Sequence, residues 1–391
     1  NRISGFARHL VRMGHEVTVI TGLPNYPVRK LYPGFRVRWC QIDQDGGVKL
    51  WRTWLTICYP KRPIHRLMNY LGFFFSSLSA AFFCAGRHDV IIATSGPILV
   101  GFSGVILSLF KRKPLVLDLR DMWPERVVAA GEFANPLAVK ILEFVEKMMY
   151  WRASRIICVT QGLHDHLLEK EVPARKLAVI TNSTDPVFFE QDVRGKVFEE
   201  FGIAENAFVA VYAGNFGIFQ DLELILDAAQ NLATHHEIRF LLVGEGVKRR
   251  SLEEETARRG LNNVHIGPNL DRHQLARVLK KSKVGLNANT CIAHNAMAIP
   301  VKMFDYMACG LPVVLANTGE VEKIVEESKA GFCVPQGSVE SFSEAILKLY
   351  RDDRARCEMG QNGTRFVRKH FDARVLSDKL AGILSEVTSR T

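Results

Sequence analysis

Short apolar, β-branched runs alternate with helical stretches along most of the chain. Such runs are typical of strands that are buried on both faces of a sheet. The predicted strands are residues 16–20, 89–93, 115–119, 155–159, 177–181, 207–213, 238–243, 263–266, 283–287, 312–315 and 331–334. The clearest predicted helices are residues 220–234, 248–259 and 271–281. This alternation indicates the α/β class with parallel sheets.

The predicted strands are too many for one small sheet, and the composition changes at residues 181–186 (TNSTDP). We therefore predict two doubly wound, parallel-sheet (Rossmann-like) domains that face each other across a cleft. The first spans residues 1–182 and the second residues 187–366, and residues 367–391 form a C-terminal helix that packs back on the first domain. An eight-fold barrel is disfavoured, because the glycine-rich turns after two strands are typical of open sheets.

The chain opens on a predicted helix followed by a strand, RISGFARHLVRMGHEVTVI. A parallel sheet of this kind usually starts with a strand and a loop. We therefore expect a first strand to precede this sequence.

The composition is that of a globular protein, with 47% apolar and 24% charged residues among 391. Wholesale disorder is therefore excluded. The eight cysteines form no CxxC pair and no Cys/His cluster at zinc spacing, so we predict reduced thiols in a cytoplasmic protein.

The net charge of +10 lies entirely in the first half of the chain. Residues 1–190 hold 25 Lys and Arg against 15 Asp and Glu, whereas residues 191–391 hold 26 of each sign. A basic half can face nucleic acid, an anionic membrane or an anionic substrate. No basic motif interleaved with aromatics is present, so we do not expect nucleic-acid binding.

Two uncharged stretches lie in this basic half, residues 67–86 and 90–110. Each is long enough to span a bilayer. Three interpretations stay open: a transmembrane hairpin, a helix lying on an anionic membrane surface, and ordinary core packing. The basic segment YPKRPIHR, with Lys61, Arg62 and Arg66, precedes a Phe-rich stretch and favours the surface helix over the hairpin.

Glycine-rich turns follow two strands of the second half. Gly214, Asn215 and Gly217 follow the strand at 207–213, and Gly244 and Glu245 follow the strand at 238–243. Glycine allows backbone N–H groups to approach an anion at a helix N-terminus. The full G-x-G-x-x-G fingerprint is absent, so nicotinamide binding is disfavoured.

A third element of the second half is IPVKMFDYMACGLPVVLA, residues 299–316. Pro300 and Lys302 open a predicted helix, and Asp305 is expected in its first turn. A lysine at a helix N-terminus is unfavourable unless an anion binds there; otherwise it is a solvated side chain. Because a carboxylate can accept two hydrogen bonds from a ribose diol, the three elements together indicate a nucleoside diphosphate site.

The segments VYAGNFG, FLLVGEGVKRRSLE, NVHIGPNLDRHQLARVLKKSKVGLN and KMFDYMACGLPVV resemble the donor domain of GT-B glycosyltransferases of family 4. The first half resembles their acceptor domain. LVLDLRDMWPE is similar to a subgroup that builds bacterial surface polysaccharides such as O-antigen and exopolysaccharide. The resemblance implies a retaining glycosyltransferase that moves a sugar from a nucleotide-diphosphate sugar to a growing, lipid-linked surface glycan, without a cofactor or a metal.

The resemblance also implies site residues. Those for the donor nucleotide-sugar are Gly214, Asn215, Gly217, Gly244, Glu245, Pro268, Lys302, Met303 and Asp305. Those for catalysis are Asp121, Arg120 and Lys302, with Asp121 taking a proton from the acceptor hydroxyl. The alternative for Asp121 is an ion pair with a neighbouring arginine that shapes the loop.

The sequence departs from the family pattern at charged positions. Asp305 stands at the second of two family glutamates, but Met297 replaces the first. Asn215 and Gln220 stand where the family has an Arg and a Lys for the pyrophosphate, so Lys302 is the expected substitute. Arg120 precedes Asp121 where a His is common. The backbone N–H groups of residues 214–217 and 298–302 are expected to assist Lys302.

Other interpretations of the chain remain open. The only D-x-D, Asp43-Gln44-Asp45, is followed by two glycines and indicates a turn, not a metal site. A nucleotide-sugar 2-epimerase shares the architecture but needs no membrane. A degenerate nucleotide-sugar-binding module would explain the missing charges. The favoured enzyme is cytoplasmic and peripheral on the inner face of the plasma membrane.

Overall fold

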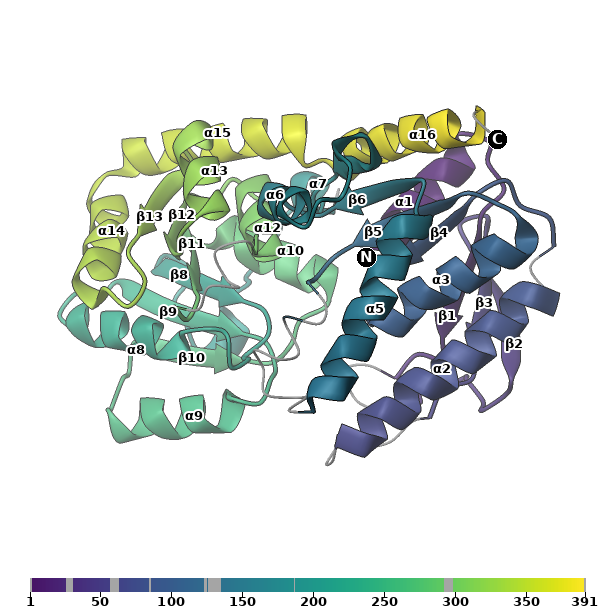
Figure 1. Cartoon of the computed structure of the whole chain (residues 1–391). Helices are drawn as coiled ribbons and strands as arrows, with labels where there is room; N and C mark the ends of the chain where they lie inside the picture. Colours follow the sequence, from purple (N-terminus) through teal and green to yellow (C-terminus); the bar gives the residue numbers. More distant parts are fainter. Residues whose placement is uncertain are drawn as a thin grey trace. The chain divides into compact units, whose positions relative to one another are not determined.

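The computed structural model of the chain describes residues 2–25, 31–56, 63–83, 86–122, 125, 135–185, 187–291 and 298–389 (Figure 1). The chain divides into two compact units. Unit 1 comprises Asn1–Thr181 and Leu376–Thr391, and unit 2 comprises Asn182–Val375. The division falls one residue from the predicted boundary, but residues 367–375, expected in the C-terminal segment, lie in unit 2.

Unit 2 is built on one six-stranded parallel sheet, whose strand order is β10-β9-β8-β11-β12-β13. Its strands are β8 (Phe208–Ala213), β9 (Ile238–Val243), β10 (Val264–Gly267), β11 (Val284–Ala288), β12 (Val313–Ala316) and β13 (Gly331–Val334). The chain starts at the central β8, moves outward to β10 and then returns to pair β11 with β8 on its other side. The direction of winding therefore reverses between β8 and β11, where open α/β sheets bind ligands at the carboxyl ends of the strands.

Helices cover both faces of this sheet. They are α7 (Val187–Glu190), α8 (Leu222–Asn231), α9 (Arg249–Arg258), α10 (Arg272–Lys281), α12 (Val301–Ala308), α13 (Glu320–Ser328), α14 (Val339–Arg351) and α15 (Asp353–His370). Successive strand residues point to opposite sides, so Val211 belongs to one core with Phe304 and Tyr212 to the other with Phe240. Local side chains cap the helix N-termini. At α10, for example, the Asp271 carboxylate accepts a hydrogen bond from the N–H of Gln274.

Unit 1 has a four-stranded parallel sheet in the order β4-β5-β6-β7. Its strands are β4 (Ile91–Thr94), β5 (Leu115–Leu119), β6 (Arg155–Cys158) and β7 (Leu177–Val179), and the helices are α1 (Arg2–Arg12), α3 (Ile98–Lys111), α5 (Pro136–Arg152), α6 (Gln161–Glu169) and α16 (Ala373–Ser389). Leu376 and Leu380 of α16 share a core with Phe6 and Leu10 of α1. The C-terminal helix is therefore part of unit 1. The predicted strands are correct to within two residues at each end, and the α/β fold class is confirmed.

A buried ion pair fixes the start of α1. The Arg2 guanidinium donates to Asp118 of β5 at 2.8 Å and to the carbonyl of Ile180 at 2.8 Å. Both charged side chains are almost completely buried. Removing one partner would leave an uncompensated buried charge, so this contact specifies how α1 meets the sheet.

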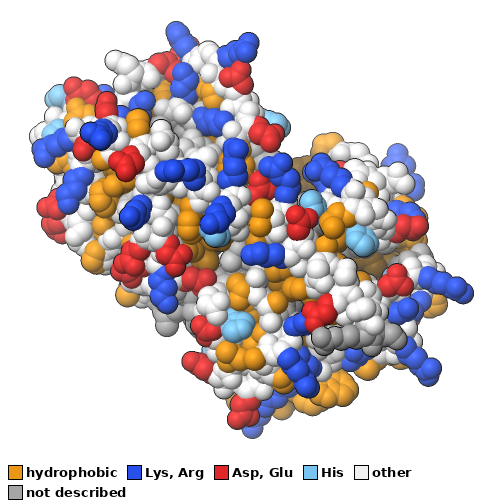
Figure 2. Space-filling view, turned by 90° about the horizontal axis from the view of Figure 1, so that it is seen from above, with side chains coloured by type: hydrophobic (Ala, Val, Ile, Leu, Met, Phe, Trp, Pro, Cys, Tyr) orange, Lys and Arg blue, Asp and Glu red, His pale blue; other side chains and the backbone are white. Residues whose placement is uncertain are grey.

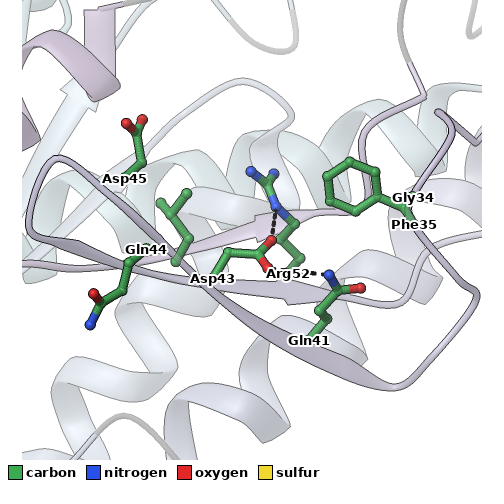
Figure 3. A pocket seen from close by; sticks show the side chains of 8 residues that line it. Gly34, Phe35, Gln41, Asp43, Gln44, Asp45 and Arg52 are labelled. Atoms are coloured by element: carbon green, nitrogen blue, oxygen red, sulfur yellow. Dashed lines mark hydrogen bonds and ion pairs between the residues drawn. The ribbon is translucent and has the colours of Figure 1, made fainter.

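A second sheet of unit 1 was only partly predicted. It has the order β1-β3-β2, with β1 (Thr18–Gly22) parallel to β3 (Val48–Thr53) and β2 (Cys40–Asp45) antiparallel to it. The prediction of a turn at Asp43–Asp45 is wrong: both aspartates lie on β2, and the turn is Gly46-Gly47, both with positive φ. The strand was missed because aspartate is a poor strand former. Asp43 pairs with Arg52 at 2.6 Å (Figure 3). Asp45 pairs with Arg8 of α1 at 2.7 Å.

The two uncharged stretches fold differently from each other. Most of the first is the helix α2 (Pro63–Phe83), and the second divides into β4, a turn and α3. Over the part of the chain described, no helix is both long and apolar enough to cross a membrane. On the face of the molecule seen in Figure 2, Lys and Arg side chains are mixed with Asp and Glu.

Candidate nucleotide-sugar site

The loops after β8 and β9 lie against each other at the carboxyl edge of the unit 2 sheet. The N–H of Gly214 donates to Val243 at 3.0 Å, and the N–H of Phe216 donates to Glu245 at 2.8 Å. A side chain at Gly244 would lie 1.8 Å from the carbonyl oxygen of Gly214. These glycines are therefore required by the close approach of two backbones.

This packing changes the expected role of the backbone amides. The N–H groups of Gly214 and Phe216 are used between the loops, and that of Gly217 donates to the Gln220 side chain at 3.2 Å. The prediction that the whole turn presents free donors is therefore wrong. Within the described residues, only the Asn215 N–H of this turn has no partner, and Asn215 is exposed.

The N-terminus of α12 offers further donors. Pro300 is its N-cap, and no side chain caps the helix. The first N–H groups of a helix have no intrahelical partner and carry the positive end of its dipole. The amides of Val301 and Lys302 therefore favour an anion at this point.

The alternative interpretation of Lys302 was a solvated side chain, and the structure does not show one. Lys302 is half-buried, its Nζ lies 3.8 Å from the centre of the Tyr212 ring, and a Cβ at Gly214 would lie 3.0 Å from the same Nζ. No carboxylate pairs with Lys302 in the portion of the chain that the structure describes. Burial lowers the pKa of its ammonium to about 7. A bound anion would restore the charged form.

Tyr212 and Tyr306 hold this corner of the site, although the sequence did not single them out. The Tyr212 hydroxyl donates to the carbonyl of Asn215 at 2.8 Å, and the Tyr306 hydroxyl accepts from the N–H of Ala213 at 2.8 Å. Both rings are fully buried. The end of β8 and its loop are therefore held from two sides, and the Tyr212 ring also lies under Lys302.

Asp305 was expected in the first turn of α12. It is instead the fifth residue of this helix and lies in the second turn. Its Oδ1 accepts a hydrogen bond from the Thr184 hydroxyl at 2.7 Å. Burial raises the pKa of this carboxyl to about 7, although the Thr184 hydrogen bond acts in the opposite direction. Asp305 and Lys302 therefore both change protonation near neutral pH, and a ligand that binds their charged forms would shift both.

The remaining predicted donor residues fall into two groups. Glu245 and Pro268 are exposed at the ends of β9 and β10, on the same edge of the sheet. Met303 is fully buried in the core, so its side chain cannot contact a ligand. The Met303 side chain belongs to the core between α12 and the sheet, and a role for this residue in donor binding stays a prediction.

Two cations near this edge were missed. Arg249 donates to the carbonyls of Gly244 at 2.8 Å and Gly267 at 3.0 Å, and so joins the loops after β9 and β10. Lys248 pairs with Glu223 at 2.9 Å. The run VKRR in the sequence was the available signal, but its contacts with distant carbonyls were not predictable. These cations are already partnered, unlike Lys302.

Two buried amides lie near the carboxyl ends of β11 and β12, Asn287 within β11 and Asn317 just after β12. Asn287 donates to Asn317 at 2.9 Å, and both are almost completely buried. The side-chain oxygen of Asn287 and the nitrogen of Asn317 have no hydrogen-bond partner. Unsatisfied buried polar groups are costly, so this pair is a marked feature of the edge that the sequence did not reveal.

The predicted catalytic residues of unit 1 follow β5. The N–H of Arg120 donates to the Ser95 hydroxyl at 3.0 Å, and its side chain is exposed. The Asp121 carboxylate lies beside Gly96, and Gly96 belongs to the turn after β4. Both residues are therefore at the carboxyl edge of the unit 1 sheet, as predicted, whereas Lys302 belongs to unit 2. Met297 lies outside the described residues.

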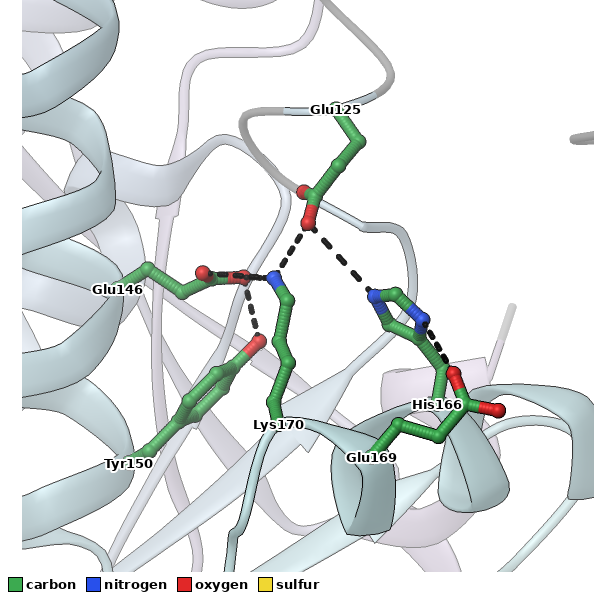
Figure 4. Close-up of polar contacts among 6 residues, drawn as sticks. All are labelled: Glu125, Glu146, Tyr150, His166, Glu169 and Lys170. Carbon is green, nitrogen blue, oxygen red and sulfur yellow. Dashed lines mark hydrogen bonds and ion pairs between the residues drawn. The ribbon is translucent and has the colours of Figure 1, made fainter.

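A network of charged side chains holds Glu125 (Figure 4). Lys170 pairs with Glu125 and, at 3.0 Å, with Glu146 of α5. The Tyr150 hydroxyl donates to Glu146 at 2.7 Å. Burial raises the pKa of Glu146, against the opposing effect of these hydrogen bonds. The network anchors Glu125 to α5 and α6.

The described residues include no group of three His, Cys, Asp or Glu side chains placed to hold a metal ion. Asp43 and Asp45, the one D-x-D, are instead paired with arginines. The absence of a metal requirement stays a prediction.

Glycine loops, an uncapped helix N-terminus and the half-buried Lys302 lie at the switch point of the unit 2 sheet, where doubly wound sheets of the Rossmann type hold nucleotide phosphates. Sequence comparison identifies the family. Residues 193–366 match the family described as glycosyl transferases group 1, and residues 1–183 match the glycosyl transferase 4-like domain. The chain therefore belongs to the GT-B glycosyltransferases of this family, and it is a glycosyltransferase.

Individual relatives are distant but cover much of the chain. The Escherichia coli (strain K12) glycosyl transferase WcaI, named for colanic acid biosynthesis, is 24% identical over 86% of this chain and 84% of its own. The sucrose-phosphate synthase of Thermosynechococcus elongatus matches with a TM-score of 0.75 and 18% identity over 100% of this chain and 93% of its own. Anabaena HepE, solved with UDP and glucose, matches with a TM-score of 0.68 and 19% identity over 87% of each chain. These structures show the GT-B fold.

Proposed function

We propose that this glycosyltransferase moves a sugar from a nucleotide-diphosphate sugar, with retention of configuration, onto a growing lipid-linked surface glycan. The observation that carries the proposal is the half-buried ammonium of Lys302. It has no carboxylate partner among the described residues, and it lies beside Gly214 and the uncapped N-terminus of α12. A buried cation without a counter-charge is costly in the free protein. A diphosphate supplies the missing charge.

The reaction requires charge stabilisation more than it requires a protein nucleophile. As the bond between the anomeric carbon and the phosphate oxygen breaks, the oxygen keeps the electron pair and the sugar ring becomes positive. Lys302 and the α12 amides would stabilise the leaving diphosphate. Asp305 would accept hydrogen bonds from the ribose hydroxyls when it is ionised.

The acceptor hydroxyl forms the new bond to the anomeric carbon. We assign its proton to Asp121, with Arg120 beside it, because both residues follow β5 at the edge where a parallel sheet presents its ligands. Attack on the face from which the diphosphate leaves would give retention. Neither a metal nor a cofactor is part of this proposal.

A lipid-linked acceptor requires that unit 1 meet a membrane, and its surface supports this. Helices α2, α3 and α5 lie side by side (Figure 1). Their exposed apolar side chains are Leu67, Met68, Leu71, Phe75, Phe83, Leu109, Phe110, Leu137, Ile141, Phe144 and Trp151. On α5, Ile141 and Phe144 form a stripe with exposed Lys140, Glu143 and Lys147 along one side. Apolar residues bordered by lysines are typical of a surface that binds an anionic membrane.

The sequence first suggested membrane binding through the basic residues around the start of α2. Lys61 and Arg62, and the side chain of Arg66, lie outside what the structure describes. We retain them in the proposal together with a cytoplasmic, peripheral location on the inner face of the plasma membrane. WcaI, whose name refers to colanic acid biosynthesis, is consistent with a surface glycan as the product.

A thermal-shift panel of UDP, GDP, ADP and their sugar conjugates tests the donor part of the proposal. A ligand at a hundred times its dissociation constant should stabilise the protein by about 2.7 kcal/mol. Release of free nucleoside diphosphate that depends on membrane-extracted glycan acceptor would then establish transfer. Conversion of the nucleotide-sugar into its 2-epimer, without acceptor and without net release of nucleoside diphosphate, would favour a 2-epimerase. Binding with neither release nor epimerisation would favour a degenerate module.

A further inference from the structure

A hollow of about 580 Å³ lies on the β2–β3 hairpin of unit 1, outside the nucleotide site (Figure 3). Its lining includes Phe35, Gln41, Asp43, Asp45 and Arg52. The mixture of one ring, one cation, carboxylates and an amide is unlike the apolar lining of most small-molecule pockets. It resembles what a sugar requires, because each hydroxyl both donates and accepts a hydrogen bond.

Arg52 is held in position within the hollow. Its Nε donates to Asp43 Oδ2 at 2.6 Å, and Gln41 donates to the other oxygen of the same carboxylate at 3.2 Å. The Arg52 guanidinium carbon lies 5.2 Å from the centre of the Phe35 ring. The guanidinium is therefore fixed by a hydrogen bond on one edge and by a ring on one face, which reduces the entropy lost when a ligand binds.

The two terminal nitrogens of Arg52 remain available. Neither has a hydrogen-bond partner among the residues that the structure describes, and Figure 3 shows them pointing away from Asp43. Only Nε faces the carboxylate of Asp43. The fork of two terminal nitrogens matches a second carboxylate, which can accept two parallel hydrogen bonds.

The charges around Arg52 permit such a ligand. Asp43 is paired with Arg52 itself, and Asp45 is paired with Arg8 at 2.7 Å. The Oδ1 of Asp45 and the side-chain oxygen of Gln41 remain acceptors without partners. A ligand that fits this set carries one carboxylate and several hydroxyl donors.

The position of the hollow also suits a substrate. Arg52 is the last but one residue of β3, and β3 ends beside the end of β1. Parallel strands present ligands at their carboxyl ends. Arg52 and its cross-strand neighbour Gln41 therefore lie at the carboxyl end of β3, and the rest of the hollow follows the hairpin toward Asp45.

We propose that the Arg52 hollow binds a hexuronic acid residue of the acceptor glycan, with the sugar carboxylate on Arg52 and a sugar hydroxyl on Gln41, its cross-strand neighbour. The inference rests on the proposed function in one respect, that the acceptor is a glycan. It adds a substrate class to unit 1, an acidic glycan rather than a neutral one.

The test compares two probes that differ only at the carboxylate, methyl α-glucuronide and methyl α-glucoside, in saturation-transfer NMR titrations with the full chain. We expect the glucuronide to bind at least about tenfold more tightly, since one hydrogen bond to a charged group corresponds to about that ratio. Arg52→Gln should remove this preference. Arg38→Gln is the matched control, because Arg38 is exposed in the same segment and does not line the hollow.

Phe35→Leu is a second variant that keeps the Arg52 charge but removes the ring beneath it, and it should weaken glucuronide binding with both ion pairs intact. Equal affinity for the two sugars, an unchanged preference in Arg52→Gln, or no saturable binding of glucuronide would each overturn the inference. The nucleotide panel is run on the same protein. Nucleotide binding without glucuronide binding refutes the inference alone, whereas glucuronide binding without any nucleotide binding refutes the proposed donor site alone.

Discussion

Replacing Lys302 by methionine should stabilise the free protein and impair the enzyme. Methionine keeps an unbranched side chain over the Tyr212 ring but removes the ammonium. Burial lowers the Lys302 pKa from 10.5 to about 7, and each pKa unit corresponds to about 1.4 kcal/mol. The cost of the buried charge is therefore at most about 5 kcal/mol.

The real gain should be smaller than this upper limit. The Nζ retains its contact with the Tyr212 ring at 3.8 Å, worth up to about 2 kcal/mol, and it can turn toward solvent. We expect Lys302→Met to stabilise the protein by about 1–3 kcal/mol at pH 6, where one kcal/mol raises the Tm by about 2–4 °C.

The pH dependence has a defined sign. The unfolded chain holds the Lys302 proton up to pH 10.5, whereas the folded protein loses it above about pH 7. The cost is therefore fully present below pH 7 and is relieved as the pH rises toward 10.5. The advantage of Lys302→Met in thermal unfolding should shrink over the same range. Lys323→Met is the control, because Lys323 is exposed on α13 and should show no such trend.

Function should change in the opposite direction. Lys302→Met should weaken binding of the nucleoside diphosphate identified in the panel at least about tenfold and lower turnover about 100-fold, as expected for lost charge stabilisation. Binding of the free nucleoside, which has no phosphate, should stay the same. A variant that is no more stable at pH 6, or that loses nucleoside and diphosphate binding equally, would refute the reasoning.

Three further predictions concern the donor ribose, the acceptor and the membrane. Asp305→Ala should weaken nucleoside diphosphate binding at least about tenfold. Because burial raises the Asp305 pKa to about 7, wild-type affinity for the free nucleoside, which lacks the phosphates that Lys302 would bind, should increase as the pH rises through 7. An unchanged dissociation constant in the variant would reject the assignment. Asp121→Asn keeps the shape of the side chain, and wild-type turnover in it would end the proposed role as a base. The protein should float with anionic liposomes at low salt and come off at about 1 M salt, where the Debye length is about 3 Å. Ile141→Ser with Phe144→Ser should reduce flotation but not nucleotide binding; flotation equal to wild type would exclude this surface.

Much of the fold was predictable because the relevant patterns are local. A strand buried on both faces needs a short apolar run, as in LVLDL and IRFLLV, and the structure has β5 and β9 at those residues. Helix starts depend on nearby side chains such as Asp271. The β2 strand was missed for the converse reason, because its aspartates have turn-forming preferences that pairing with Arg8 and Arg52 overrides.

The sequence predicted where the candidate site lies, but not the contacts of its residues. The sequence determined that glycine turns and Lys302 follow strands of one sheet, and a parallel topology brings such positions to one edge. Only the tertiary structure decided which N–H groups the loops consume, that Lys302 lies over Tyr212, and that Asp305 accepts from Thr184, 121 residues away. The sequence does not reveal whether the side chain of a given lysine or aspartate is solvated or buried. Its charge, pKa and free hydrogen-bonding groups depend on distant segments that fold against it.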